Sequence, residues 1–236
     1  MISVCLATYN GGRYVGEQLR SVLMQLGPDD EVVISDDGST DNTLAEIARL
    51  NDPRLRLLSN SGRAGVIRNF ERVLLAARGE TIFLCDQDDV WLPGKVNRCL
   101  AGLSESVLVV TDCAVVNSEL TIMAPSFFRL RRSGPGLLRN LWKNRYLGCC
   151  MAMRRSVLGA ALPFPAHIAM HDWWIGLVAE RMGKVHFLDE TLSLYRRHGG
   201  NASQATMHST ASLMIQVRWR LDMVLYLMTQ PIRHSR

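Results

Sequence analysis

The chain has 236 residues, of which 47% are hydrophobic and 21% charged, and its formal net charge at pH 7 is +5. This length and apolar content are sufficient for one domain with a substantial buried core. No run approaches the roughly eighteen uninterrupted apolar residues of a transmembrane helix, which argues against a membrane-spanning protein.

The N-terminus and the cysteines indicate the compartment. Residues Met1 to Ala7 carry no basic lead and enter an apolar strand at once, unlike a signal peptide or a transit sequence. None of the six cysteines belongs to a C-x-x-C pair, and several lie in apolar strand-like runs, which predicts buried, reduced thiols. We therefore expect a cytoplasmic protein.

Arginine dominates the basic residues, contributing 24 of the 27. These residues form no dense run with interleaved aromatic residues, so we expect no nucleic-acid partner. The planar guanidinium group forms paired hydrogen bonds with phosphate. Phosphorylated small molecules or anionic membrane surfaces are therefore the better candidate partners.

Strands alternate with helices over the first hundred residues. Apolar runs at 2–7, 31–35, 55–58 and 81–85 predict buried strands, and amphipathic spacing predicts a helix after each of the first three. This alternation predicts an α/β fold with a parallel, doubly wound sheet flanked by helices.

Polar residues follow each of these strands. They are Thr8-Tyr9-Asn10, Asp36-Asp37, Asn60 and Asp86-Gln87-Asp88-Asp89. Because ligands of α/β sheets bind beyond the carboxyl ends of the strands, we expect these residues to form one site. The three carboxylates at 86–89 repel one another unless a cation lies on them, and oxygen ligands suit Mg²⁺ or Mn²⁺ holding phosphates. A solvated acidic loop is the alternative.

The second half of the sequence is less regular. It predicts a helix at 93–103 and a strand at 107–111, and residues 123–136 are interpreted either as a substrate-covering loop or as a solvated linker. A strand at 148–153 and a short helix at 156–161 follow.

The remaining residues predict two helices and two short strands. A helix opens at His171 and runs to Met182, strands follow at 184–188 and 192–195, and a final helix covers 207–228.

Six motifs, in this order, resemble the family 2 glycosyltransferases of bacterial surface-polysaccharide synthesis, over about residues 2–201. They are Thr8-Tyr-Asn-Gly-Gly12, Asp36-Asp-Gly-Ser-Thr-Asp-Asn-Thr43, Asn60-x-Gly62 with Arg68-Asn69, Asp86-Gln-Asp-Asp-Val-Trp91, His171-Asp-Trp-Trp174 and Tyr195-Arg-Arg-His-Gly-Gly-Asn201. The acidic motif and His-Asp-Trp-Trp are similar to those of the rhamnosyl and related sugar transferase branch.

The resemblance implies a single GT-A type nucleotide-sugar-binding domain over residues 1–206, with a mostly parallel central sheet. It implies an inverting, metal-dependent transfer of a sugar from a UDP- or dTDP-sugar, with dTDP-L-rhamnose as one candidate donor. The acceptor would be a hydroxyl of a glycan or of a lipid-linked saccharide. The cofactor would be Mn²⁺ or Mg²⁺, and the location cytoplasmic or peripheral on the inner face of the cytoplasmic membrane.

Nucleotide-binding residues follow from the same resemblance. The first loop would line the base and ribose site, Glu17 would support that loop, and Asp36 or Asp37 would bond the pyrimidine ring. Arg68 would lie near the diphosphate. The implied set is Thr8, Tyr9, Asn10, Glu17, Asp36, Asp37, Arg68 and Asp86.

The implied metal residues are in the acidic motif and near the end of the last motif. Asp86 and Asp88 match the D-x-D signature, and Asp89 is the extra acid of the D-x-D-D form. We expect Asp88 to bind the metal directly, Asp86 to face the ribose or the metal, and Asp89 the sugar or the metal. His198 matches a histidine that completes the metal site in related enzymes, with a surface-loop histidine as the alternative.

Asp172 matches the family's catalytic base, which usually stands second in a Glu-Asp pair, whereas this chain has His171 first. A carboxylate there would take the proton of the acceptor hydroxyl; favouring the dipole of its helix is the alternative. Trp173 and Trp174 would either stack on the acceptor sugar or pack the helix.

Two other function classes would use the same residues differently. A metal-dependent nucleotidyltransferase or phosphohydrolase would need the acidic motif without the distant Asp172. A non-catalytic nucleotide-sugar-binding scaffold would not require intact Asp88, Asp89 and Asp172.

Residues 207–236 form a separate C-terminal region. Arg218, Arg220, Arg233 and Arg236 accompany the apolar stripe of the predicted helix, as in helices that lie on a membrane surface. Packing onto the domain or a homodimer contact are the alternatives.

Overall fold

The structure, a computed structural model, describes residues 1–59, 62–199 and 212–229. Its first half alternates strands and helices as the sequence pattern predicts, with each predicted strand bound correct to within one residue. The elements are β1 (Ile2–Thr8), α1 (Val15–Leu23), β2 (Glu31–Asp36), α2 (Thr43–Arg49), β3 (Leu55–Leu58), α3 (Val66–Ala76) and β4 (Thr81–Asp86).

The second half contains shorter elements. They are β5 (Val90–Trp91), α4 (Lys95–Leu103), β6 (Leu108–Val116), β7 (Ile122–Ala124), α5 (Phe127–Arg131), α6 (Leu137–Trp142), the 3₁₀ turn η1 (Gly148–Cys150), β8 (Met151–Arg154), α7 (Arg155–Ala161), α8 (His171–Met182), β9 (Val185–Arg196) and α9 (Leu213–Thr229).

Three predictions for this half were wrong in detail. Residues 123–136 are not an irregular loop, because they contain the end of β7 and all of α5. The strand predicted at 148–153 begins only at Met151, after η1. The two strands predicted at 184–188 and 192–195 form one strand, β9, which follows β6 through two shifts of register.

Some predicted features lie outside the described residues. The final helix is described from Leu213 onwards, so its predicted start at Met207 is outside, as are Asn60, Gly200-Asn201, Arg233 and Arg236.

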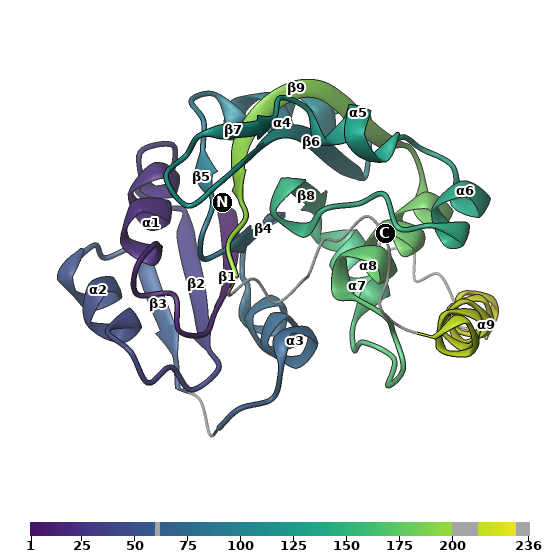
Figure 1. Cartoon of the computed structure of the whole chain (residues 1–236), viewed down its shortest axis with the longest axis horizontal. Coiled ribbons are helices and arrows are strands. Elements are labelled where there is room, and N and C mark those ends of the chain that lie inside the picture. Colours follow the sequence, from purple (N-terminus) through teal and green to yellow (C-terminus); the bar gives the residue numbers. More distant parts are fainter. Residues whose placement is uncertain (60–61, 200–211, 230–236) are drawn as a thin grey trace.

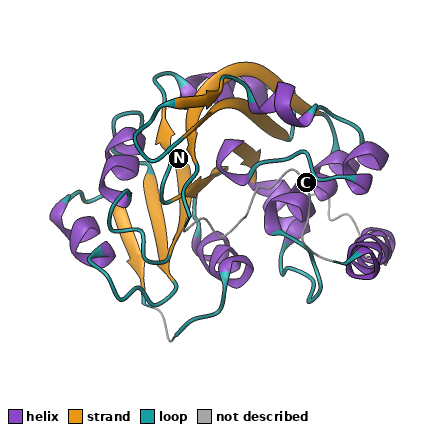
Figure 2. Cartoon of the chain, in the orientation of Figure 1, coloured by secondary structure: helices purple, strands orange, loops and turns teal. Residues whose placement is uncertain are grey.

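The sheet is parallel on one side and mixed on the other. Its strand order is β3-β2-β1-β4-β8-β6-β9-β5, with β7 paired to β6. Figure 2 shows the strands of this sheet in orange, with helices around them in purple. Strands β3, β2, β1 and β4 are parallel, whereas β8 runs antiparallel to both of its neighbours. The predicted α/β class is confirmed, and the helices flank a sheet that curls over towards β9 (Figure 1).

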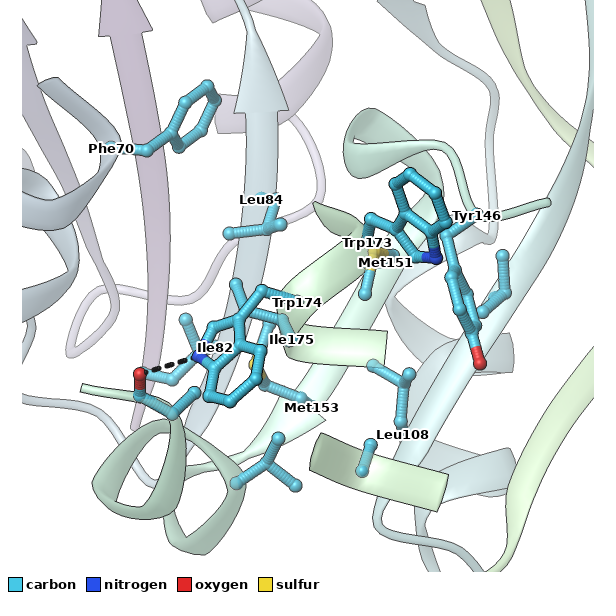
Figure 3. Close-up of a cluster of buried hydrophobic side chains, with 14 of the residues drawn as sticks. Phe70, Ile82, Leu84, Leu108, Tyr146, Met151, Met153, Trp173, Trp174 and Ile175 are labelled. Atoms are coloured by element: carbon cyan, nitrogen blue, oxygen red, sulfur yellow. Dashed lines mark hydrogen bonds between the residues drawn. The ribbon is translucent and has the colours of Figure 1, made fainter. Parts of the chain in front are cut away.

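Two apolar layers hold the helices to this sheet. One layer joins β1 and β2 to α1 and α4, and the other joins the opposite sheet face to α3, α7 and α8. Trp174 is fully buried in the second layer, where its indole N–H donates to the Ala161 carbonyl oxygen at 2.9 Å (Figure 3). This packing positions α8, which begins at the candidate base.

Helix α9 rests on the second layer through a small part of its surface. Met223 and Leu227 are buried there, and Tyr226 meets the Trp174 ring edge-on. Across the described ranges, no helix has both the length and the apolar content that crossing a bilayer requires.

Candidate active site

The carboxyl ends of three neighbouring parallel strands gather the first half of the site. In the strand register, Thr8 of β1 lies beside Asp36 of β2, and Ala7 lies beside Asp86 of β4. The loops that leave these strands must therefore start within a few ångströms of one another. The sequence prediction that these strand ends meet at one edge is confirmed.

Gln87 joins the acidic loop to the loop after β1. Its Oε1 accepts hydrogen bonds from the Thr8 hydroxyl at 2.6 Å and from the Tyr9 N–H at 2.8 Å, while its Nε2 donates to the Tyr9 carbonyl oxygen at 3.0 Å. A Cβ at Gly11 would lie 2.2 Å from Gln87 Oε1, so the loop needs glycine there. Sequence reasoning missed this role.

Asn10 joins the first loop to the loop after β2. Its N–H donates to the Ser39 hydroxyl and its Oδ1 accepts from the Thr40 N–H, each at 2.8 Å. Asp36 accepts from the Ser39 N–H at 2.8 Å within the same loop. The predicted base-binding loops thus form one hydrogen-bonded surface.

Asp37 has a structural contact that the sequence did not indicate. Its two carboxylate oxygens accept from the Ala64 N–H at 2.6 Å and the Gly65 N–H at 2.8 Å, just before α3. Asp37 therefore anchors the start of α3 to the β2 end.

The acidic loop concentrates charge in a poorly solvated position. Burial, followed by the charges of Asp88 and Asp172, raises the pKa of Asp86 to about 8. Burial and the carboxylates of Asp88 and Asp86 also raise the pKa of Asp89 well above its ordinary value. Both shifts mean that the ionised site is unfavourable unless a cation neutralises it.

Arg196, at the end of β9, fixes the acidic loop from the other half of the domain. Its N–H donates to Asp89 Oδ1 at 2.9 Å, and its Nε donates to the Asp88 carbonyl oxygen at 2.7 Å. Its Nη2 forms an ion pair with Glu17 Oε2 at 2.5 Å, and its guanidinium lies over the Tyr14 ring. Glu17 therefore supports the site through Arg196, a residue for which no role was predicted.

His198 lies two residues beyond β9 and contacts the acidic loop directly. Its Nε2 is 2.9 Å from Asp88 Oδ2. This contact supports the predicted placement of His198 beside the D-x-D-D motif and does not fit the surface-loop alternative.

Lys95 supplies a buried positive charge beneath these acids. Its ammonium group is completely buried and donates to the Cys149 carbonyl oxygen and to the Ser193 hydroxyl, each at 2.6 Å. Lysine is almost never fully buried unless it is paired or hydrogen-bonded. The sequence showed only a lysine in the first turn of a helix, so this role could not be read from it.

The donor atoms suit a divalent cation. One ligand atom each from Asp86, Asp89 and Cys149 lies within 4.8 Å of the others, and Asp89 Oδ2 is buried without a hydrogen-bond partner. An unsatisfied buried carboxylate oxygen is costly, and a bound cation would satisfy it. The expectation that Asp88 binds the metal directly stays a prediction, since the described grouping contains the other two acids.

Asp172 stands at the N-terminus of α8, facing the acidic loop. Its Oδ1 accepts from the Trp173 N–H at 2.6 Å and from Asn144 Nδ2 at 3.3 Å. Burial raises its pKa to about 6, and its charge in turn contributes to the raised pKa of Asp86. The structure therefore brings the predicted base within electrostatic reach of the acidic motif.

His171, which replaces the glutamate of the usual pair, does not hold Asp172. Its ring stacks on Phe70 at 3.9 Å, and neither ring nitrogen has a hydrogen-bond partner. Burial lowers its pKa to about 3, so it is neutral. Asn144 and the helix N-terminus hold the base instead.

The side chains of the remaining predicted residues have partners other than the acidic motif. Arg68 is paired with Glu71 at 2.5 Å and is partly exposed. Trp173 and Trp174 are buried, and the Trp173 indole N–H donates to the Asn140 carbonyl oxygen. The Trp174 indole N–H donates to the Ala161 carbonyl oxygen (Figure 3). The packing alternative therefore holds for the tryptophans, whose faces are covered by core residues.

Comparison with known sequences places this site in context. The glycosyl transferase family 2 model matches residues 3–161. An uncharacterized glycosyltransferase of Nostoc sp. is 30% identical over 230 residues, covering 89% of this chain and 69% of the relative.

Two relatives carry names that state a reaction. The UDP-Glc:alpha-D-GlcNAc-diphosphoundecaprenol beta-1,3-glucosyltransferase WfgD of Escherichia coli is 30% identical over 186 residues, covering 76% of this chain and 70% of the relative. The dTDP-rhamnosyl transferase RfbG of Shigella flexneri is 28% identical over 219 residues, covering 83% and 72%.

Solved structures share the fold at low sequence identity. Staphylococcus aureus TarS in complex with UDP-GlcNAc has a TM-score of 0.74 and 22% identity, covering 95% of this chain and 66% of TarS. The mannosyltransferase PcManGT of Pyrobaculum calidifontis, in complex with GDP-Man and Mn²⁺, has a TM-score of 0.63 and 18% identity, covering 100% and 65%. The chain spans 59% of the length of several other curated relatives.

Proposed function

The chain belongs to glycosyl transferase family 2, and from this premise we propose that it is an inverting, metal-dependent transferase of cell-surface polysaccharide synthesis. It moves a sugar from a UDP- or dTDP-sugar to a hydroxyl of a glycan or a lipid-linked saccharide. The observation that carries the proposal is that Asp172 and the acidic motif meet at η1. A Cβ at Gly148 would lie 3.5 Å from Asp172 Cβ, and the next residue, Cys149, has its thiol within 4.8 Å of carboxylate oxygens of Asp86 and Asp89.

The donor nucleotide occupies the joined loops after β1 and β2. Thr8, Tyr9 and Asn10 line this surface, and Asp36 offers its carboxylate beside them. We assign the pyrimidine contact to Asp36 or Asp37. The carboxylate oxygens of Asp37 accept from backbone N–H groups before α3, and those of Asp36 accept from Gly38 and Ser39, so contacts within the protein favour neither residue. The names of WfgD and RfbG support UDP- and dTDP-sugars respectively as the donor class, with dTDP-L-rhamnose as one candidate.

A divalent cation, Mn²⁺ or Mg²⁺, belongs at the acidic motif. Asp86, Asp88 and Asp89 would hold it, with His198 beside Asp88 and Cys149 at its buried side. The Mn²⁺ named with PcManGT supports this choice. When bound, the cation would stabilise the negative charge that develops on the departing nucleoside diphosphate.

Asp172 takes the proton of the acceptor hydroxyl. A pKa of about 6 leaves it mainly ionised at neutral pH, and a base with a pKa near the working pH is effective in proton transfer. Asn144 and the Trp173 N–H hold the carboxylate in position. Attack by the activated hydroxyl from the side opposite the leaving diphosphate inverts the anomeric centre.

The decisive experiment measures nucleotide release across UDP-, dTDP- and GDP-sugars, with and without saccharide acceptors. We expect one donor class to be used, with Asp172→Asn retaining nucleotide binding but losing acceptor-dependent release. Asp29→Asn, at an exposed aspartate just before β2 and so at the opposite end of that strand from Asp36, is the control and should behave as the wild type. Unchanged transfer by Asp172→Asn would refute the base assignment.

The rival classes give other products. A nucleotidyltransferase would release pyrophosphate from a nucleoside triphosphate, and a phosphohydrolase would release nucleoside monophosphate or phosphate. Neither would depend on Asp172. A scaffold would release no nucleotide from any donor. The observation that favours the transferase is again the carboxylate of Asp172, which neither rival class requires.

We further propose that residues 207–236 attach the domain to the cytoplasmic face of a membrane or to a second copy. The supporting observation is the large exposed area of α9, whose apolar residues at the surface are Met214, Ile215, Val217, Leu221, Leu225 and Met228. Co-sedimentation with anionic vesicles tests attachment to a membrane, and measurement of the mass in solution tests attachment to a second copy.

A further inference from the structure

Four arginines gather beside the candidate base, on α5, on α6 and in the loops that follow them. They are Arg131, Arg132, Arg139 and Arg145. Arg139 Nη2 and Arg145 Nη1 both donate to the Arg132 carbonyl oxygen, at 2.7 and 2.5 Å. We call these four residues the arginine cluster. Segments separated in the sequence thus converge on a single backbone oxygen.

The cluster is not neutralised by the protein. Within the described ranges none of its members forms a salt bridge with a carboxylate. Burial and then the charges of Arg139, Arg132 and Arg131 lower the pKa of Arg145. The part of this lowering that comes from the neighbouring arginines is a repulsion that a bound anion would relieve.

Two guanidinium groups of the cluster also carry unused donors. Arg131 Nε and Arg145 Nε are both buried and have no hydrogen-bond partner. Buried donors without partners are rare in folded proteins, and a ligand often satisfies those that persist at functional sites. Burial lowers the pKa of Arg131, as it does that of Arg145.

Capping of α5 is a simpler explanation for part of this geometry. Arg132 ends α5 in the left-handed region with a φ of 55°, and cations near a helix C-terminus bond its last carbonyl oxygens. Capping accounts for the two donations to the Arg132 oxygen. It does not account for the two unpartnered Nε atoms or for four like charges in one place.

Asn144 connects the cluster to the reaction centre. Its carbonyl oxygen accepts from Arg131 Nη2 at 3.3 Å, and its side-chain amide donates to Asp172 Oδ1 at 3.3 Å. The charge of Asp172 also acts on Arg131, raising its pKa against the effect of burial. One residue, Asn144, therefore joins the cluster to the candidate base.

We propose that the arginine cluster binds the phosphate or diphosphate group of the acceptor, holding the acceptor while its hydroxyl meets Asp172. The inference rests on the proposed function, since it assigns these residues to the acceptor of that transferase. Arginine suits this ligand because its fork forms paired, charge-assisted hydrogen bonds with phosphate oxygens.

Two kinds of acceptor carry a phosphate group that the arginine cluster could bind. It is either the diphosphate that links a saccharide to a lipid or a phosphate carried by a water-soluble glycan. Next to the cluster, α6 exposes Leu138 and Trp142, which are 79% and 75% accessible. An acceptor with an apolar chain would gain from this surface, whereas a soluble phosphate would not.

The test measures binding by calorimetry to the whole chain saturated with nucleoside diphosphate and Mg²⁺, so that the donor site is filled. Probes are inorganic pyrophosphate, geranyl diphosphate and geraniol, at about 0.15 M salt to screen diffuse attraction. We expect both diphosphates to bind and geraniol not to bind. Tighter binding of geranyl diphosphate would identify the lipid-linked source, and equal binding the soluble one.

Variants separate the cluster from general positive charge. Arg132→Gln and Arg139→Gln change exposed members and should weaken diphosphate binding about tenfold or more, as expected for a lost charge-assisted hydrogen bond. Arg129→Gln removes an exposed arginine of the same helix outside the cluster and should bind as the wild type. Equal weakening in all three variants, or in none, would overturn the proposal, as would failure of wild type to bind either diphosphate.

This binding assay requires no sugar transfer. Absence of nucleotide release from every donor would refute the proposed function while leaving the diphosphate binding measured here intact. Conversely, the protein could transfer sugar to an acceptor while Arg132→Gln and Arg139→Gln bind diphosphate as tightly as the wild type does. That result would refute the role of the arginine cluster and leave the proposed function intact.

Discussion

The buried histidine before the base gives a stability prediction that depends on pH. His171 is 5% exposed, its ring stacks on Phe70, and burial lowers its pKa to about 3 from the ordinary 6.5. The unfolded chain therefore binds a proton between pH 6.5 and 3 that the folded protein does not bind. Because the unfolded state holds more protons there, the free energy of unfolding falls as the pH is lowered through this window.

The size of the effect follows from the shift. Each pH unit below 6.5 lowers the contribution of His171 by about 1.4 kcal/mol, so about 2 kcal/mol is lost at pH 5. His171→Leu removes the titrating ring. Raised pKa values of Asp172 and Asp86 act in the opposite direction, but they are common to both proteins and cancel in the difference.

The assay is reversible urea denaturation of the wild type and of His171→Leu at pH 7, 6 and 5. We expect the stability of the wild type relative to the variant to fall by about 2 kcal/mol over this range. His167→Gln, at an exposed histidine four positions earlier, is the matched control. A constant difference between wild type and His171→Leu would show that His171 is not a buried neutral group.

Three further perturbations probe the site. With the Asp172 pKa at about 6, kcat/KM should fall about tenfold per pH unit below pH 6, and a pH–rate profile without this limb would refute the base assignment. Gly11→Ala places a Cβ 2.2 Å from Gln87 Oε1 and should raise the donor KM about tenfold through loss of the Gln87–Tyr9 bonds, whereas an unchanged KM would contradict the link between the loops. Lys95→Met should cost about 3–5 kcal/mol in denaturant unfolding, because it leaves buried acceptors and carboxylates uncompensated; a cost below about 1 kcal/mol would disprove that role.

The sequence was sufficient to predict the first half of the fold because local pattern and tertiary structure agree there. Buried parallel strands read as continuous apolar runs, and polar residues mark where they end. The strand ends at Thr8, Asp36 and Asp86 could therefore be placed at one edge before the register was known. In the second half, turns interrupt apolar runs, as at 148–150, and residues 184–195 bend through register shifts without a break.

The contacts that organise the site could not be predicted, since their signal is tertiary. Gln87 looks like a spacer between two acids, and Lys95 looks like a surface helix residue. Arg196 is one of 24 arginines, and nothing in its local sequence shows that its side chain spans Glu17, Asp88 and Ser118. The sequence contains one indirect indication of these basic residues. The three carboxylates of the acidic motif repel one another, so a positive charge must lie near them.

That requirement also explains why the site depends on both halves of the domain. The family match ends at residue 161, yet Asp172, Arg196 and His198 lie beyond it. Arg196 and His198 contact the acidic loop directly, and Asp172 adds to the negative charge that the loop carries. A strand-end acidic loop alone would be a cluster of repelling carboxylates. In the function we propose, it becomes a site for a metal and a nucleoside diphosphate because β9 and α8 bring the positive charge of Arg196 and the carboxylate of Asp172 to it.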